Sequence, residues 1–266
     1  QLFEAISKRK GPVPEADAAH AAVRAARQRP GGGPETGNHR DPAGPAGSQR
    51  PPYGPQRRGV HGGALCQADA RAAQGMNAVT QARLRWLSRR LDACRNLQDA
   101  RPDDAVGIQV CEEALAAAGE GNYGVGAVIL DSDGSVIVRA RNRVFEPGFR
   151  SDGHAEMLAV NRLESEFPEK TPREMSLFVT LEPCPMCLTR LKLAGIGRVR
   201  YLSPDPDGGM VSCRDNLPPI WRLLNPRQDF APADVSASLQ RLGKRIFQVN
   251  LRALRRRLVE RVYSAE

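Results

Sequence analysis

Two short segments constrain this chain more than any other part of its sequence. They are His154-Ala155-Glu156 and, thirty residues later, Pro183-Cys184-Pro185-Met186-Cys187. A catalytic zinc ion usually takes three protein ligands and leaves its fourth tetrahedral position to water. His154, Cys184 and Cys187 supply that number of ligands. A fold that uses them together must bring both segments to one point.

The residue types in these segments suit hydrolytic chemistry. Two cysteines spaced C-x-x-C at the start of a helix can direct both sulfurs at one ion, and the positive end of the helix favours thiolates. Zinc lowers the pKa of the water that it binds to roughly 7, so hydroxide is available at neutral pH. Glu156 lies two residues after His154. Its carboxylate can therefore reach that water without ligating the metal and move its proton.

Other interpretations of these motifs stay open. A lone C-x-x-C also occurs as a redox pair or as half of a structural zinc site, although the sequence holds no second C-x-x-C and no H-x-x-x-H after it. His154 alone would be an ordinary polar residue, and its pairing with Glu156 gives it weight as a ligand. A relative that keeps zinc without catalysis is a further alternative, which the presence of Glu156 disfavours.

Hydrophobic periodicity and turn residues predict alternating helices and strands. Helices are expected over about 78–97, from Asp103 or Asp104 to 118, over 154–166 and over 184–194, and strands near 125–131, 135–141, 175–181 and 198–202. Asp133-Gly134 predicts a hairpin turn, and Gly195 predicts the end of the cysteine helix. This order favours a three-layer α/β/α domain. Both metal motifs lie where a helix begins, so they can meet at one edge of the sheet.

At these residues the chain resembles the cytidine and deoxycytidylate deaminase superfamily. The resemblance is to the branch whose first zinc ligand is His, which includes tRNA adenosine, deoxycytidylate and guanine deaminases. Besides the metal motifs it rests on residues 124–129, 140–143, 179–187 and 197–201, and it covers about residues 103–210. It implies a cytidine deaminase-like α/β/α fold with a central mixed sheet. It also implies Zn²⁺ bound by His154, Cys184 and Cys187, with Glu156 as the proton shuttle.

The resemblance further implies a substrate pocket. It places Asn142 in contact with sugar or base, and the backbone of Ala155 and of the Glu182–Pro183 turn along the base. An Asn after a strand is as often a turn residue, so both interpretations of Asn142 are kept. Residues 203–216 are expected to form a loop that either helps to select the substrate or is an uninvolved surface connection.

The composition divides the chain into parts. Twelve glycines and nine prolines make up 28% of residues 1–75, a composition typical of disorder. The first methionine is Met76 and residue 1 is Gln, so residues 1–75 are expected to be a disordered extension or not part of the natural protein. Residues 76–210 are expected to form the deaminase domain, with its core at 103–210, and residues 211–266 a helical C-terminal extension.

The formal net charge of +9 is unevenly distributed. Residues 1–75 carry +5, residues 76–234 carry −2 and residues 235–266 carry +6, so the expected catalytic core is nearly neutral. Apolar residues at helical spacing over 239–262 predict a basic amphipathic C-terminal helix. Its basic residues are Arg241, Lys244, Arg245, Arg252, Arg255, Arg256, Arg257 and Arg261. The helix either packs on the core or on a dimer partner, or it holds nucleic acid.

The sequence predicts a cytoplasmic protein without a membrane partner. It shows no apolar run long enough for a transmembrane helix and no signal peptide. The cysteines outside the metal motif lack a disulfide-like spacing, which fits a reducing compartment. These are Cys66, Cys94, Cys111 and Cys213.

The leading hypothesis is a zinc-dependent hydrolase of C–N bonds in cyclic amidines. It would remove the exocyclic amine of a free nucleobase, nucleoside or nucleotide as ammonia, a substrate class that the neutral core favours. One alternative keeps the chemistry but acts on adenosine in tRNA or cytosine in single strands, with the 241–261 region holding the strand and a flipped base reaching the zinc. Another is a zinc module without turnover. The base and the oligomeric state, including a homodimer, stay open.

Overall fold

The computed structural model describes residues 77–96, 98, 100–222 and 228–263. The disorder expected for residues 1–75 lies outside the described residues. The first helix was expected to reach residue 97, but it ends at Cys94, because Arg95 and Asn96 form a turn.

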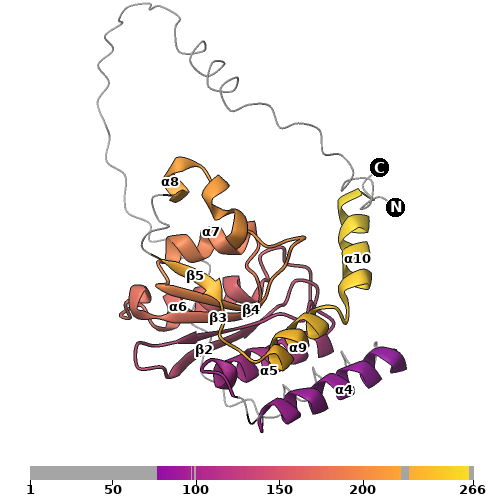
Figure 1. Cartoon of the computed structure of the whole chain (residues 1–266). Coiled ribbons are helices and arrows are strands. Elements are labelled where there is room, and N and C mark those ends of the chain that lie inside the picture. The colour runs from indigo at the N-terminus through magenta and orange to yellow at the C-terminus, as the bar shows by residue number, and fades with distance from the viewer. Residues whose placement is uncertain (1–76, 97, 99, 223–227, 264–266) are drawn as a thin grey trace, which may run out of the picture. The chain divides into compact units, whose positions relative to one another are not determined.

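A five-stranded mixed sheet forms the centre of the fold, in the order β2-β1-β3-β4-β5 (Figure 1). Its strands are β1 (Gly126–Leu130), β2 (Val136–Arg141), β3 (Ser176–Leu181), β4 (Arg198–Ser203) and β5 (Asp229–Pro232). β1 pairs antiparallel with β2 and β3, whereas β3–β4 and β4–β5 are parallel. The predicted mixed sheet is confirmed. Strand β5 was not predicted, because it is a short edge strand that ends in proline.

Helices cover both faces of the sheet, which confirms the three-layer α/β/α fold (Figure 1). α6 (Ala155–Glu166) and α7 (Pro185–Ala194) pack on one face, and α5 (Asp104–Gly119) and α9 (Ala237–Phe247) on the other. Ala127 and Ile129 of β1 belong to the first core, while Val128 between them packs against α5. This alternation follows from the two-residue period of a strand. β3 is buried at all six positions, as expected for a strand covered on both faces.

α4 (Ala78–Cys94) lies outside the layer formed by α5 and α9 (Figure 1). The side chain of Asn77 begins this helix by accepting a hydrogen bond from the Thr80 amide at 2.9 Å. Leu87 and Leu91 form one hydrophobic cluster with residues of α5 and α9. The sheet face and α4 therefore share a core through these two helices.

The C-terminal segment consists of two helices where the apolar spacing predicted one. α9 ends at Phe247, and α10 (Leu251–Tyr263) begins after a short break. The Asn250 side chain explains the break, because it donates hydrogen bonds to the carbonyls of Ala118 at 2.8 Å and Asn122 at 3.0 Å, at the end of α5. β5 and α9 both pack on the sheet, so the packed fold continues past residue 210.

The acidic residues at the start of α5 act differently from the predicted helix caps. Asp103 makes no cap hydrogen bond with its own helix, and its carboxylate accepts the Asp234 amide at 2.7 Å. Asp104 accepts the Ser236 amide at 2.7 Å. Both carboxylates therefore join the start of α5 to the turn before α9. Further short helical turns are η1 (Pro172–Glu174), η2 (Val211–Asn216) and α8 (Pro219–Arg222).

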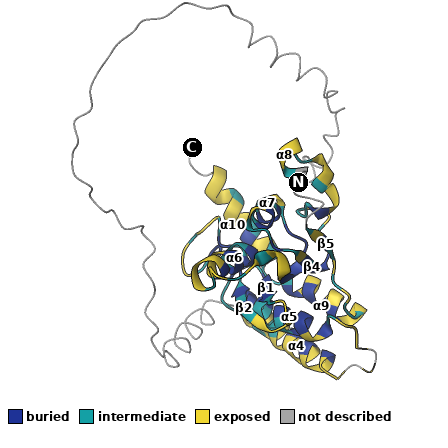
Figure 2. Cartoon of the chain, turned by 90° about the vertical axis from the view of Figure 1, so that its left-hand side faces the viewer, coloured by how far each residue is buried: buried dark blue, intermediate teal, exposed yellow. Residues whose placement is uncertain are grey.

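Burial follows this layered arrangement. Figure 2 shows buried residues on the sheet and on the helix sides that face it, with exposed residues on the outer sides of α4 and α10. In the described part of the chain, no helix combines the length and the apolar character that crossing a membrane requires.

The close approach of β1 to α5 gives a stability prediction. A Cβ on Gly126 would lie 2.3 Å from the Val110 carbonyl oxygen and 2.7 Å from the Ala114 amide nitrogen, both backbone atoms of α5. We expect Gly126→Ala to push helix and sheet apart and to lower the free energy of unfolding by about 1–3 kcal/mol. Urea denaturation followed by circular dichroism measures this change.

Gly119→Ala is the matched control, because a Cβ at Gly119 meets nothing within 4 Å. Equal midpoints for the two variants would contradict the close packing of β1 on α5.

Candidate metal centre and active site

The two metal motifs meet where α6 and α7 begin. His154 is the last residue before α6 and Cys184 the last before α7, and both have extended backbone. Cys187 lies in the first turn of α7, and Pro185 stands at that helix's first position, where a missing N–H costs no hydrogen bond. The α7 turn places both cysteine sulfurs on the same side, toward His154. The expected placement of both motifs at helix starts is what the structure has.

The three side chains are close enough to share one ion. His154 Nδ1 lies 3.7 Å from Cys184 Sγ and 3.5 Å from Cys187 Sγ, and all three candidate ligand atoms lie within 4.8 Å of one another. A tetrahedral zinc ion with its usual Zn–N and Zn–S distances holds such nitrogen and sulfur atoms about 3.6 Å apart. The donor set therefore fits zinc in both chemistry and spacing, and it supplies three of the four ligands of a tetrahedral site.

The protonation of the two cysteines prepares them for a cation. Hydrogen bonds with Cys187 and with His154 lower the pKa of Cys184 to about 4, although burial opposes the shift. Burial lowers the pKa of His154, but its hydrogen bond with Cys184 and the Glu156 charge outweigh burial and raise this pKa overall. The hydrogen bond with Cys184 and burial raise the pKa of Cys187, so Cys184 is the more readily ionised of the two cysteines.

Glu156 lies in the first turn of α6 beside this cluster, and 4% of its surface is exposed. Burial raises the pKa of its carboxyl group, and the neighbouring His154 acts in the opposite direction. A carboxyl group whose pKa is raised toward neutrality is suited to accept and return a proton. Glu156 does not belong to the ligand cluster, and its role in proton transfer stays a prediction.

The predicted substrate-contacting residues lie on the segments next to the metal ligands in the chain or at the end of β2. Asn142 follows β2, is 2% exposed, and its side-chain oxygen accepts the Val144 amide at 3.1 Å, as a turn residue does. Ala155 is fully buried at the start of α6. In the turn before Cys184, the Glu182 amide donates to the Ser203 carbonyl at 2.9 Å, and the Pro183 carbonyl accepts the Met210 amide at 2.9 Å. Contact of these four residues with a substrate stays a prediction.

The side chain of Glu182 has a role that the sequence analysis missed. It is buried, and its two carboxylate oxygens accept the backbone amides of Asp205 at 3.1 Å and Ser212 at 3.2 Å. Gly209 lies so close that a Cβ there would be 2.5 Å from the Glu182 carboxyl carbon. The loop after β4 is therefore held against the turn that carries Cys184. The signal was an acidic residue directly after a buried strand, since burying a carboxylate is costly unless it is hydrogen-bonded.

A second feature beyond the motifs is the contact of α10 with the segment that leads from β2 to His154. The guanidinium of Arg257 lies 4.8 Å from the centre of the Phe145 ring, and that of Arg261 lies 4.1 Å from the Phe149 ring. Arg257 also forms an ion pair with Glu146 at 3.3 Å. Through these contacts α10 packs against the segment before His154, although the two are about one hundred residues apart in the sequence.

Comparisons with known proteins agree with this geometry. The family described as the cytidine and deoxycytidylate deaminase zinc-binding region matches residues 102–203, which include the three candidate ligands, Glu156 and the four predicted substrate-contacting residues. A tRNA-specific adenosine deaminase of Bacillus subtilis is 35% identical over 109 residues, which are 41% of this chain and 66% of that protein. A tRNA-specific adenosine deaminase of Rickettsia felis is 32% identical over 105 residues, which are 38% of this chain and 72% of that protein.

Similarity also extends to a larger protein. A tRNA(Ile)-lysidine synthase of Deinococcus radiodurans is 39% identical over 103 residues, which are 37% of this chain. The chain spans 18% of that protein and just under two thirds of the Bacillus relative.

The fold and the convergent His-Cys-Cys cluster define a zinc-binding α/β/α domain. The chain belongs to the cytidine and deoxycytidylate deaminase family.

The ligand cluster predicts the metal content of the protein. We expect the purified chain to hold one zinc ion, and Cys187→Ser to lose it, because the variant removes one of three ligands. Elemental analysis after gel filtration measures the zinc-to-protein ratio. Cys213→Ser, at an exposed cysteine outside the cluster, should keep the zinc of the unsubstituted chain. Full zinc in Cys187→Ser would exclude this ligand set.

The anchoring of the loop after β4 predicts a local change in dynamics. Glu182→Gln keeps the side-chain volume but removes the charge that accepts two backbone amides, which weakens hydrogen bonds worth about 1.5–3 kcal/mol each. We expect amide hydrogen exchange at Asp205 and Ser212 to accelerate tenfold or more, as about 1.4 kcal/mol of lost protection requires. Glu174→Gln, at an exposed position, is the control. Unchanged exchange at Ser212 would show that the carboxylate does not hold the loop.

Proposed function

We propose that this chain is a zinc-dependent hydrolase that removes the exocyclic amine of a nucleobase and releases ammonia. The observation that supports this most directly is the buried Glu156 beside three ligands that converge from two helix starts. This arrangement combines a metal donor set that leaves one position free with an adjacent carboxylate outside it. Membership of the deaminase family supports the same reaction.

The roles of the residues follow from their positions. His154, Cys184 and Cys187 would hold zinc, which when bound supplies a Lewis acid that lowers the pKa of water to roughly 7. Glu156 accepts a proton from the attacking water and donates it to the ring nitrogen beside the amine-bearing carbon. It transfers the second proton to the amine. The C–N bond then breaks, ammonia leaves and the ring carbon keeps the water oxygen as a carbonyl.

The burial of Glu156 assists these transfers. Because burial raises the pKa of its carboxyl group, the protonated form that must donate to nitrogen is less costly than it would be in water. Asn142, Ala155, Glu182 and Pro183 are proposed to line the base pocket around this carboxylate. The Glu182 side chain would act there by positioning the loop after β4, through the two amides that it accepts.

The first substrate class proposed is a free nucleobase, nucleoside or nucleotide, because residues 76–234 carry a formal charge of only −2. A second candidate is adenosine within tRNA. It is supported by two relatives that are described as tRNA-specific adenosine deaminases and are 35% and 32% identical to this chain. A cytoplasmic place of action and a homodimer belong to the same proposal.

The proposal is tested by ammonia release from a panel of bases, nucleosides, nucleotides, single-stranded DNA and tRNA. Glu156→Gln should lower the rate on the accepted substrate by about 10²–10⁴-fold, because proton transfer loses its carboxylate. Zinc content and circular dichroism of the variant should match those of the unsubstituted protein, because Glu156 lies outside the ligand set.

Glu164→Gln is the matched control, since Glu164 lies on the same helix, α6, and is exposed. A zinc-loaded protein that releases no ammonia from any substrate would support the non-catalytic zinc module. Full activity of Glu156→Gln would overturn the proton-transfer role of this residue.

A further inference from the structure

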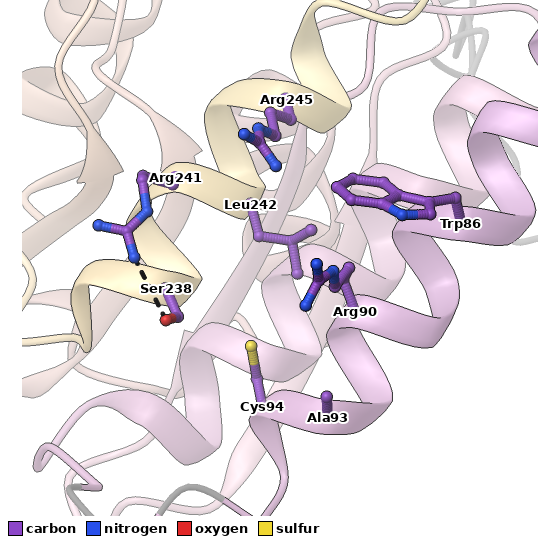
Figure 3. A pocket seen from close by; sticks show the side chains of 8 residues that line it. All are labelled: Trp86, Arg90, Ala93, Cys94, Ser238, Arg241, Leu242 and Arg245. Carbon is purple, nitrogen blue, oxygen red and sulfur yellow. Dashed lines mark hydrogen bonds between the residues drawn. The ribbon is translucent and has the colours of Figure 1, made fainter.

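A pocket of about 270 Å³ lies between α4 and α9, on the sheet face opposite α6 and α7. Figure 3 shows Trp86 and Arg90 of α4 near Arg245 of α9, while Arg241, which also lines the pocket, lies further along α9 beside Ser238. Leu242 and Cys94 form its floor (Figure 3). The pocket thus combines three guanidinium groups with one aromatic ring over an apolar base.

Trp86 organises two of these guanidinium groups. The guanidinium of Arg90 lies 5.2 Å from the centre of the indole ring and that of Arg245 lies 5.4 Å from it. Trp86 itself is 41% exposed, which is unusual for so large an apolar side chain. Cation–π contact orients both cations without neutralising their charge. Arg241 is held by its hydrogen bond to the Ser238 hydroxyl at 3.4 Å.

The positive charge of this pocket is uncompensated within the described part of the chain. There, no carboxylate forms an ion pair with Arg90, Arg241 or Arg245. Arginines elsewhere in the same structure do form such pairs, as Arg139 and Arg141 show with Glu113. α4 and α9 together carry seven basic side chains and a single acidic one, Asp92. Like charges gathered in this way repel one another unless an anion lies between them.

Neighbouring aromatic rings join the end of α9, the helix that carries Arg241 and Arg245, to the segment before His154. Phe247 at the end of α9 lies 6.1 Å from Tyr123, and Tyr123 lies 5.5 Å from Phe145, measured between ring centres. Phe145 and Phe149 belong to the segment that leads to His154, and Arg257 and Arg261 of α10 lie over their rings. Basic side chains of α10 therefore also lie at the chain ahead of the metal centre.

We propose that the pocket between α4 and α9 binds phosphate groups of a single nucleic-acid strand. Guanidinium groups match phosphate oxygens in geometry, and several converging from two helices suit a backbone that repeats its charge. An exposed indole adds a surface against which a base or sugar can pack. Such binding would favour nucleic acid, the second candidate substrate of the proposed function, over a free base. The inference rests on the proposed function for the reaction but not for the binding.

The binding test uses the full-length protein and a short single-stranded RNA with a fluorescent label. Anisotropy titrations at several salt concentrations give the affinity and its salt dependence. Arg241→Gln/Arg245→Gln should weaken binding tenfold or more at low salt. It should also reduce the slope of log K against log salt by about 1.4, since each phosphate contact with a single strand contributes roughly 0.7.

Arg162→Gln/Arg198→Gln is the matched control, with the same loss of charge at exposed arginines outside the pocket. It should bind the RNA as the unsubstituted protein does. In a Trp221→Phe background, RNA should also quench the fluorescence of Trp86, the other of the two tryptophans in the sequence. Equal weakening by both double variants would overturn the proposal, because the effect would then reflect net charge.

Further measurements distinguish a nucleic-acid strand from other possible occupants of the pocket. If inorganic tripolyphosphate quenches the fluorescence of Trp86 and RNA does not, the pocket binds a small polyphosphate and the proposal of a nucleic-acid strand is overturned. If Arg241→Gln/Arg245→Gln keeps its RNA affinity but changes from a dimer to a monomer in solution, the pocket is an interface between two copies of the chain and the proposal is overturned. RNA binding without deamination would contradict the proposed function alone, and deamination without this binding would contradict the pocket alone.

Discussion

The pairing of β3 between β1 and β4 is the constraint on which the rest of the structure depends. β3 is antiparallel to β1, parallel to β4 and buried along its whole length, and it leads directly into the turn that carries Cys184. β1 also pairs with β2, whose end leads to His154. Strand register sets where the chain leaves β2 and β3. Two motifs thirty residues apart therefore meet at one point, where α6 and α7 begin and their candidate ligands face each other.

Two buried carboxylates near this point show how the same residue type takes opposite roles. Glu182 accepts two backbone amides from the loop after β4 and so joins that loop to the Cys184 turn. For Glu156 burial is the largest influence on its carboxyl group, and it raises the pKa. A carboxylate with its hydrogen bonds filled is an anchor, whereas one whose proton affinity is raised beside a metal donor set is suited to proton transfer. The surroundings, and not the residue type, decide between the two.

The basic C-terminal region likewise divides into parts with different partners. In α10, Arg257 and Arg261 lie over phenylalanine rings, and Arg257 pairs with Glu146, so their charge helps to brace the segment before His154. In α9, Arg241 and Arg245 face the pocket that Trp86 and Arg90 complete from α4. Net charge alone treats these arginines as equivalent. Their neighbours distinguish the α10 arginines, which contact phenylalanine rings, from the α9 arginines, which line the pocket.

The amino-acid sequence by itself determined the ligand set, the placement of both motifs at helix starts and four of the five strands. These features depend on short-range patterns, namely ligand spacing, two-residue and helical periodicity, and the turn residues Gly134 and Gly195, both of which adopt positive φ. Only the tertiary structure decided that Asn250 divides the C-terminal helix, that Asp103 joins the turn before α9, that Glu182 anchors a loop and that β5 completes the sheet. The contacts of Asn250 and Asp103 join residues more than 120 positions apart. Local patterns reflect the conformational preferences of neighbouring residues. Contacts between distant residues stabilise the protein only when the folded chain brings the two partners together, so the sequence pattern does not show them.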